Sequence, residues 1–444
     1  MDESTLLILM LGISLIISIS SLDDAFIDLL AFGITRRPFT RKPATVDDIP
    51  TTAVFVANWH EADVLGPMVE GNLARIPIPQ VKLYLGVYPN DTDTRDVALM
   101  LAAKYPDRVR VIVNTLPGPT SKGQMLNEMF RQVYSAPDAP DLVVLHDSED
   151  VIDPRTFQAY AAYARDYDYI QVPVFSLRAT HRSKVAATYM DEFAERHTRE
   201  MIVRNAVGAM IPSAGVGTCM TKRLVQHFLH TRGTVLMGGC VTEDYILGVE
   251  VKRAGFRAAF AAISADAKRG VDFVATREFF PKTLSASIKQ KTRWVYGTCF
   301  EAMHKLGWRG DAWDIYFFLR DRKGLVTNFL PPVALVFLVL VVTGTIDPAE
   351  VPPALQPIFS ASLLFNLFAL ALRYVVRVAA CRQVYGTFEP IAVAMRWPVA
   401  LLANMVAVFR AWKIYLIESD FASKPIVWAK TAHELPEDFL AAGR

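Results

Sequence analysis

One acidic stretch of the chain carries side chains that could hold a divalent cation. The sequence HDSED, residues 146–150, directly follows the apolar run Leu142–Leu145. Carboxylate oxygens are the ligands that Mg²⁺ and Mn²⁺ prefer, and such a cation leaves room for a substrate diphosphate. We therefore expect carboxylates of this stretch to hold Mg²⁺ or Mn²⁺. A solvated turn that caps the next helix through Asp153 is the alternative explanation.

A second acidic stretch, Thr242-Glu243-Asp244, stands at the predicted start of a helix that runs to Lys252. A carboxylate beside a partner acid and a substrate can accept the proton of a hydroxyl group. This favours a general base within this pair of acids. The alternative is a capping box at the helix N-terminus, where the same acids only complement the helix dipole.

A third stretch, QKTRW at residues 290–294, lies in a helical pattern that begins near Leu284. Gln290, Arg293 and Trp294 share one face of such a helix, because they stand at positions i, i+3 and i+4. They offer an amide, a guanidinium matched to phosphate, and an indole on which a sugar ring could stack. An amphipathic helix lying on a membrane surface would show the same pattern.

Apolar runs typical of buried strands alternate with helical patterns between residues 45 and 320. We expect helices near residues 94–104 and 122–134, and strands at Ala53–Ala57, Val81–Tyr88, Val109–Val113 and Leu142–Leu145. This alternation predicts an α/β fold with a mostly parallel sheet and helices on both faces. Ligands of such sheets bind at the carboxyl ends of the strands. No GxGxxG or GxxxxGK[ST] occurs, so a dinucleotide dehydrogenase or a P-loop enzyme loses its main support.

Length and composition indicate a soluble domain joined to membrane segments. The chain has 444 residues, 52% of them hydrophobic and only 21% charged, which suits two structural units. The net charge of +2 gives no reason to expect nucleic acid as a partner. The four cysteines match no zinc spacing, so we expect reduced thiols.

The first apolar run, Leu6–Leu22, has 17 residues, near the lower limit for crossing a bilayer. A retained anchor is favoured over a cleaved signal peptide, because Asp2 and Glu3 replace the usual basic start. The basic residues that follow place that side of the membrane in the cytosol; they are Arg36, Arg37, Arg41 and Lys42.

Two later runs, Leu325–Thr343 and Ile358–Val376, predict a hairpin that enters and leaves from the cytosol, because basic residues flank it but are absent from its loop. The patch Pro398–Phe409 has 12 residues and is predicted as an interfacial or re-entrant helix, which keeps the C-terminus cytosolic; a span would put it outside. The expected domains are an anchor and linker (1–44), a cytosolic catalytic domain (45–320), a membrane hairpin with an interfacial helix (321–420) and a cytosolic tail (421–444).

The order and spacing of these motifs resemble the family 2 inverting glycosyltransferases of GT-A fold, especially the membrane-integrated polysaccharide synthases. The resemblance covers about residues 50–320 and implies a role for each acidic stretch. It implies that Asp147 and Glu149 hold the divalent cation, that Asp244 is the general base, and that Glu243 orients Asp244 or an acceptor hydroxyl. Donor binding would fall to Asp147, Arg293 and four residues in other motifs, and acceptor binding to Gln290, Trp294 and the glycines of a GVGT stretch. The donor residues are Asn58 and Glu61 of NWHE, Asp91 (preferred over Asp93), and Lys122 of SKGQMLN; the glycines are Gly215 and Gly217. The family's DxD is DxE here, and Lys291 replaces a more usual Gln or Arg.

A closer resemblance is to the bacteriophage adsorption protein B group of bacterial inner-membrane glycosyltransferases, carried by HDSEDVIDP, FFPKTLSASIKQKTRW, LGWRG, FLRDRKGL and WAKTAH. It implies an inner-membrane, multi-pass enzyme with a cytosolic catalytic domain. It also implies a nucleotide-sugar donor, expected to be UDP-N-acetylhexosamine, and a growing polysaccharide as acceptor. Three spanning segments are few for a self-contained polymer channel, so an export partner or a homo-oligomer is expected.

Two other functions remain open from the sequence. The chain could transfer a single sugar to a lipid carrier, or it could be a non-catalytic membrane receptor or scaffold subunit for polysaccharide export. The intact acidic stretches and QxxRW argue against the non-catalytic function, because a decayed site need not keep them.

Overall fold

The computed structural model describes residues 3–35, 43–178, 183–266 and 271–418. The basic residues at 36–42 and the expected tail at 421–444, with its WAKTAH sequence, lie outside the described residues.

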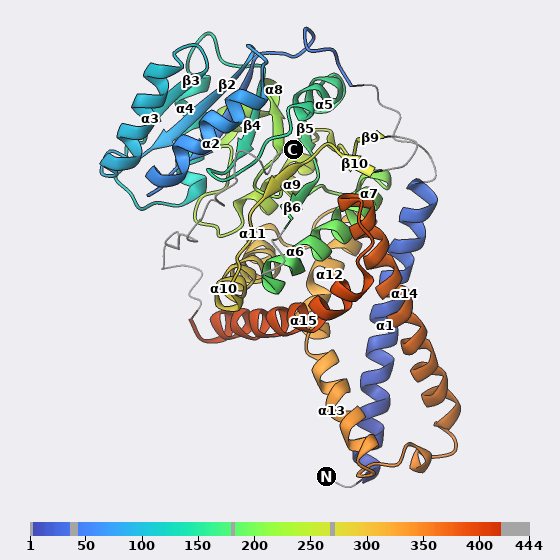
Figure 1. The fold of residues 1–444 in the computed structure, drawn as a ribbon. Helices are drawn as coiled ribbons and strands as arrows, with labels where there is room; N and C mark the ends of the chain where they lie inside the picture. The colour runs from blue at the N-terminus through green and yellow to red at the C-terminus, as the bar shows by residue number, and fades with distance from the viewer. Residues whose placement is uncertain (1–2, 36–42, 179–182, 267–270, 419–444) are drawn as a thin grey trace.

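A seven-stranded sheet in the order β3-β2-β1-β4-β7-β5-β8 forms the centre of the first unit (Figure 1). Neighbouring strands are parallel except for β7, which runs antiparallel to both β4 and β5. The bounds are β1 Thr52–Ala57, β2 Val81–Val87, β3 Val109–Val113, β4 Leu142–His146, β5 Tyr169–Gln171, β7 Thr218–Thr221 and β8 Ala258–Phe260. The predicted mostly parallel α/β sheet is thereby confirmed.

Both faces of the sheet are buried, which explains the continuous apolar runs of its strands. In β1, Ala53 and Phe55 join one core while Val54 and Val56 join the other, as the two-residue period of a strand requires. The first core contains side chains of α4 (Lys122–Tyr134), α8 (Lys222–Arg232) and α9 (Glu243–Arg253). The second contains those of α2 (Ala62–Arg75), α3 (Thr92–Lys104) and α5 (Arg155–Ala164).

Shorter elements connect the sheet to the rest of the chain. Two small sheets pair β9 (Ser264–Asp266) with β10 (Val271–Phe273) and β6 (Val174–Ser176) with β11 (Thr276–Glu278). The helices below the sheet in Figure 1 include α6 Lys184–Glu195, α7 Met201–Ala206, α10 Leu284–Val295 and α11 Ala302–Leu306. Two π-helical turns, η1 (Arg196–Glu200) and η2 (Tyr296–Glu301), continue α6 and α10.

In the described part of the chain, four stretches of helix are long and apolar enough to cross a membrane: residues 4–34, 312–342, 356–385 and 390–417. In Figure 1, the lower rod is formed by α1 (Glu3–Thr35), α13 (Leu330–Val342) and α14 (Gln356–Tyr385). The helix α12 (Ala312–Thr327) leads into α13, and the short turn η3 (Pro348–Glu350) lies between α13 and α14. The first helix is much longer than the apolar run that predicted it.

The last helix, α15 (Pro390–Lys413), continues into the π turn η4 (Ile414–Glu418), so the length argument against a span is wrong. The apolar patch at 398–409 marked only its middle, because Arg396 and Arg410 interrupt the run without ending the helix. Figure 1 shows α15 lying across the rod rather than along it. One side of α15 carries mostly small, buried side chains, and α15 packs on α6 and α10. The other side exposes Ile391, Met395, Leu402 and Phe409.

Buried ion pairs join the helices α14 and α15 to α6 of the sheet unit. Arg396 of α15 donates to both carboxylate oxygens of Asp191 at 2.7 and 2.9 Å, and Arg377 of α14 bonds Glu195 at 2.8 Å. A buried charge without its partner is costly, so these pairs specify how the helices meet the sheet unit.

Candidate active site

The turn after β4 is fixed by a buried carboxylate that the sequence did not single out. Asp150 is fully buried; one of its oxygens lies 2.7 Å from Nδ1 of His146 and accepts the Asp147 backbone N–H at 3.0 Å. Asp147 keeps its own side chain about one-third exposed (35%), whereas Glu149 is largely buried. The turn therefore presents the Asp147 carboxylate at the carboxyl end of the sheet.

Lys122 reaches the same point from the first turn of α4. The hydroxyl of Ser121 caps this helix by accepting the Gln124 backbone N–H at 3.1 Å. The Lys122 ammonium forms an ion pair with Asp147 and lies 3.4 Å from the Gly215 carbonyl oxygen. Burial lowers the pKa of Lys122, but the charges of the surrounding carboxylates, Asp147 first among them, raise it above its ordinary value. Lys122 is thus a fixed positive charge.

Asp244 lies beside Lys122 and Gly215, at the start of α9. Its Oδ1 accepts the Tyr245 backbone N–H at 2.8 Å. A Cβ atom on Gly215, whose φ is +81°, would stand 2.9 Å from Asp244 Oδ2 and 3.9 Å from Lys122 Nζ. Glycine at 215 therefore serves both the left-handed backbone and the close approach of this carboxylate. Thr242 makes no side-chain cap bond to α9, so the capping box does not form.

The enclosure of the two acids changes their protonation. Burial, together with the charge of Asp244, raises the pKa of Glu243 to about 8. Burial also raises the pKa of Asp244, although its backbone hydrogen bond and Lys122 act against the rise. Acids whose proton affinity is moved toward neutral pH are suited to proton transfer.

The helix α10, which packs on α15, brings Arg293 near the carboxylates of the two acidic stretches. Burial lowers the pKa of Arg293, and the charges of Asp147, Glu243 and Asp244 act in the opposite direction, so the guanidinium lies within the field of all three carboxylates. Among the described residues, Gln290 Oε1 is a buried oxygen without a hydrogen-bond partner.

Trp294 is held in an aromatic cluster rather than standing free. Its ring packs edge-on against Tyr189 and Phe280, with centroids 6.1 and 6.4 Å apart, and is partly exposed. The cluster fixes the orientation of the indole. Stacking of this ring on a sugar remains a prediction.

Lys291, the departure from the usual family residue, points away from the carboxylates. Its ammonium bonds both carboxylate oxygens of Glu192 on α6, at 2.6 and 2.8 Å, and Asn404 Oδ1 on α15 at 2.8 Å. The side chain is only 6% exposed. Lys291 therefore ties the motif helix to both the catalytic unit and α15.

Replacing Lys291 by methionine should lower the free energy of unfolding by roughly 2–3 kcal/mol, because Glu192 and Asn404 lose their shared cation in a mostly buried place. Thermal unfolding in detergent measures this loss. The matched control is Lys104→Met, which breaks an exposed pair with Glu70 at 2.7 Å and should lower the free energy of unfolding much less, because solvent already screens that pair. Equal losses of unfolding free energy in the two variants would contradict a stabilising role of Lys291 between α10, α6 and α15.

The three donor residues expected after β1 and β2 make structural bonds. Asn58 is buried and donates to the carbonyl oxygens of Val56 and Gly86 at 2.9 and 3.0 Å, which joins the ends of β1 and β2. Asp91 caps α3 and accepts the His60 backbone N–H at 2.6 Å. Glu61 is buried at the start of α2. Their contact with a nucleotide remains a prediction.

Gly217 lies deeper than Gly215. Its carbonyl oxygen accepts hydrogen bonds from Val172 N and the Tyr160 hydroxyl, both at 3.1 Å. An added Cβ would stand 2.6 Å from Thr276 Oγ1. Gly217 thus allows β7 and β11 to approach closely, and acceptor binding by this residue stays a prediction.

Glu278 is a further carboxylate near the turn after β4 that sequence reasoning missed. It ends β11, and the neighbouring Arg277 exchanges backbone hydrogen bonds of 3.1 and 3.2 Å with Val151. Burial and the charges of Asp150, Asp147 and Glu149 raise the pKa of Glu278 well above its ordinary value. No spacing signal marks this residue, because a long-range strand pairing brings it to the turn.

The donor set suits a cation that shares its coordination with substrate. Among the residues that the structure describes, no group of three or more His, Cys, Asp or Glu side chains is arranged to hold a metal. Mg²⁺ and Mn²⁺ sites in transferases commonly use one or two carboxylates plus phosphate oxygens and water. Asp147 and Glu149 fit that pattern. They are too few protein ligands for a closed structural metal site.

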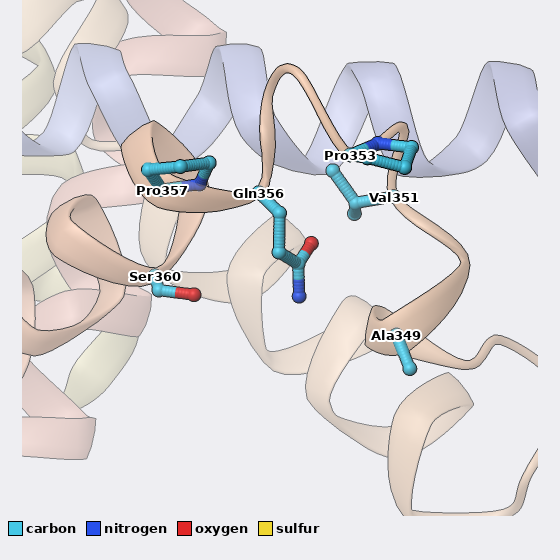
Figure 2. Close-up of a pocket in the computed structure, with 6 residues that line it drawn as sticks. All are labelled: Ala349, Val351, Pro353, Gln356, Pro357 and Ser360. Carbon is cyan, nitrogen blue, oxygen red and sulfur yellow. The ribbon is translucent and has the colours of Figure 1, made fainter.

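A separate hollow of about 460 Å³ lies at the far end of the rod, against η3, the loop after it and the start of α14 (Figure 2). Its lining residues are Ala349, Val351, Pro353, Gln356, Pro357 and Ser360. They include no ionisable group, and β4 and α9, beside which the two acidic stretches stand, lie at the opposite end of the molecule (Figure 1).

The fold and the two acidic stretches define a glycosyltransferase of family 2. The sequence model of "Glycosyltransferase like family 2" matches residues 50–297, and the chain belongs to this family. The resemblance noted from the motifs is confirmed.

Particular relatives extend the match beyond the sheet unit. Bacteriophage adsorption protein B of Escherichia coli K12 is 29% identical over 465 residues, and bacteriophage N4 adsorption protein B of Escherichia coli O157:H7 matches equally. The alignment covers 97% of this chain but only 62% of each relative, so the chain spans less than two thirds of their length. The mannosyltransferase PcManGT of Pyrobaculum calidifontis, solved with GDP-Man and Mn²⁺, aligns with a TM-score of 0.57 and 15% identity over 92% of this chain and 100% of that one. That likeness shows the GT-A fold alone.

Proposed function

We propose that the protein is an inner-membrane, inverting glycosyltransferase that moves a sugar from a nucleotide-sugar donor to a growing polysaccharide. The observation that carries the proposal is the meeting of Lys122, Asp147, Asp244 and Gly215 at one point. These groups come from four separate parts of the chain. A cationic group beside a cation-binding carboxylate and a carboxylate of raised pKa is the set that sugar transfer requires.

The donor diphosphate would bind between the β4 turn and α10. Asp147 and Glu149 would hold Mg²⁺ or Mn²⁺, which neutralises charge on the departing diphosphate. Lys122 and Arg293 would add fixed positive charge on either side of the same phosphates. PcManGT was solved with Mn²⁺, and this supports the choice of cation. We keep UDP-N-acetylhexosamine as the expected donor.

Asp244 would act as the general base. The acceptor hydroxyl oxygen attacks the anomeric carbon from the face opposite the diphosphate, and Asp244 takes the hydroxyl proton. The new C–O bond forms as the bond to phosphate breaks, and the nucleoside diphosphate leaves with the electron pair. One in-line displacement inverts the anomeric centre. Glu243 would orient Asp244 or an acceptor hydroxyl.

The acceptor would approach along α10, where Gln290 and Trp294 lie next to the membrane helices. We propose that α1, α13 and α14 span the bilayer and that α15 lies at the cytosolic interface, with the sheet unit in the cytosol. The exposed apolar side of α15 and its direction across the rod support this arrangement. An export partner or a homo-oligomer would complete a path for the polymer.

A diphosphate-release assay tests the function. The purified chain is incubated with a panel of sugar nucleotides, including UDP-N-acetylhexosamines and GDP-mannose, with and without Mn²⁺. Cation-dependent release of nucleoside diphosphate from one donor supports the proposal. No release from any donor would favour the non-catalytic receptor or scaffold function.

Single-sugar transfer to a lipid carrier is the second enzymatic candidate. The site chemistry is the same in both, and QxxRW favours polymerisation through the family resemblance. Product length on a gel separates them, since a polymerase gives a ladder or a long product while single transfer adds one residue.

The acid pair gives a pH prediction with opposite signs for activity and stability. Asp244 must be ionised to accept a proton, so kcat/KM should fall on the acid side at a pH clearly above the ordinary carboxyl range. Because the pKa of Glu243 rises from 4.5 unfolded to about 8 folded, the folded state binds more protons between these values, and stability falls as pH rises through them. Thermal midpoints of wild type and Glu243→Gln measure this, and the variant should be less sensitive to pH in that window. Parallel curves would contradict the shifted pKa.

A further inference from the structure

The loop at residues 238–242, here called the base loop, carries the chain into Thr242-Glu243-Asp244 and has no helix or strand of its own. It starts with two glycines, and Gly239 has a φ of +66°. Thr242 makes no side-chain cap bond to α9. The base loop, which leads directly into Asp244, is therefore held by contacts with other elements.

One continuous helical stretch, α10–η2–α11, holds the loop. Glu301 Oε2 accepts the Val241 backbone N–H at 2.7 Å. Lys305 donates to the Gly239 carbonyl oxygen at 2.6 Å and lies 2.9 Å from Cys240 Sγ. These bonds reach three successive residues of the loop.

Close packing adds to the polar bonds. A Cβ on Gly297 would stand 2.5 Å from Thr242 Cγ2, so only glycine lets the helix come this near to the threonine. Val241 packs beside the apolar residues of η2 and α15, including Tyr296, Phe300 and Ala411. The base loop is thus seated on the helix that also carries Arg293 and Trp294.

The π turn η2 decides which way Glu301 faces. It begins two residues after Trp294 and ends at Glu301. A π turn takes in roughly one extra residue, which rotates everything after it by about 100° compared with an uninterrupted α-helix. Without this turn, Arg293 and Glu301 could not keep their present directions together. Glu301 is only 3% exposed and serves the loop rather than solvent.

We infer that Glu301 is a positioning residue for the general base. By holding Val241, Glu301 fixes the base loop to the helix that carries Arg293 and Trp294. It thereby sets the distance between Asp244 and the groups that bind the diphosphate. The inference rests on the proposed function for its catalytic meaning. The loop contact itself can be tested without activity.

The first measurement is hydrogen exchange of the full chain in detergent, followed on peptides that cover the base loop. Glu301→Ala should raise exchange there by roughly tenfold or more, because the Val241 N–H loses its buried acceptor. Glu301→Gln keeps an acceptor oxygen and should remain close to wild type. Unchanged exchange in Glu301→Ala would overturn the inference, whatever the enzyme does.

The second measurement is steady-state kinetics with the donor found by the release assay. Glu301→Ala should lower kcat by about 10- to 100-fold with little change in donor KM, because Asp147 and Lys122 lie on other elements and Arg293 stays on α10. Glu301→Gln should restore most of kcat. The matched control is Glu128→Ala, a buried glutamate that bonds Gln132 within α4 and should leave kcat of the folded protein unchanged. A loss confined to KM, or equal losses in the Ala and Gln variants, would overturn the inference.

A third variant covers a failure of Glu301→Ala to fold. Lys305→Met removes the bonds to Gly238, Gly239 and Cys240 but keeps Glu301, and should raise exchange of the same peptides and lower kcat by a few-fold. If the wild-type chain releases no diphosphate, the proposed function fails. The exchange data still decide whether Glu301 and Lys305 hold the loop.

Discussion

Replacing Asp244 by asparagine should lower kcat by about a thousandfold or more, while donor affinity changes little. A positioned general base contributes about 10²- to 10⁴-fold, and the amide cannot take up the hydroxyl proton. The asparagine oxygen can still accept the Tyr245 backbone N–H, which Asp244 accepts at 2.8 Å, so the start of α9 should stay intact. The diphosphate groups Asp147 and Lys122 are untouched. Diphosphate release measures kcat, and binding of the nucleoside diphosphate measures affinity.

The control for this variant is Asp93→Asn. Asp93 is an exposed acid in the first turn of α3, and its carboxylate accepts the hydroxyl of the neighbouring Thr92 at 3.4 Å. Its replacement should leave both kcat and affinity near wild type. Retained turnover in Asp244→Asn would remove Asp244 as the base and leave the acceptor proton to another group.

Asp147→Asn should lower kcat/KM by at least about a hundredfold and raise the Mn²⁺ concentration needed for half-maximal activity. Charge stabilisation by a bound cation is worth several kcal/mol, and each 1.4 kcal/mol of transition-state energy is about tenfold in rate. The variant also removes the ion-pair partner of Lys122, so that the charge of Lys122 is balanced mainly by Glu243 and Asp244. Titration of activity with Mn²⁺ separates loss of the cation from loss of turnover.

Asp153→Asn is the matched control, since Asp153 belongs to the same acidic stretch. Its carboxylate bonds Arg155, through the backbone N–H at 2.9 Å and through the guanidinium, and does not face Lys122. We expect an unchanged Mn²⁺ requirement in this variant. If Asp147→Asn and Asp153→Asn respond alike to Mn²⁺, the cation is held elsewhere.

Local pattern predicted the regular elements of the sheet unit well. The strands near 53–57, 81–88, 109–113 and 142–145 are present within a few residues, because buried parallel strands are apolar on both faces. The helix carrying QKTRW also begins at the expected Leu284, where Thr283 accepts the Ala286 backbone N–H. Hydrophobic period and capping are local properties, so the residues themselves report them.

Local pattern was weaker where charged residues interrupt an apolar helix. The last helix was expected as a 12-residue patch, but α15 runs from Pro390 to Lys413. Arg396 is tolerated within it because Asp191 of α6 neutralises the charge. That partner lies about two hundred residues away in the chain, and no window of sequence contains both.

The sequence alone determined the family, the α/β fold and the types of side chain available for chemistry. Only the tertiary structure decided that Lys122, Gly215 and Asp244 share one point, that Lys291 faces α6 and α15, and that Glu301 holds the base loop. The physical reason is that propensity and periodicity act over a few residues. A catalytic arrangement instead depends on strand order, on close approaches at single glycines, and on one π turn that changes the direction of a helix face.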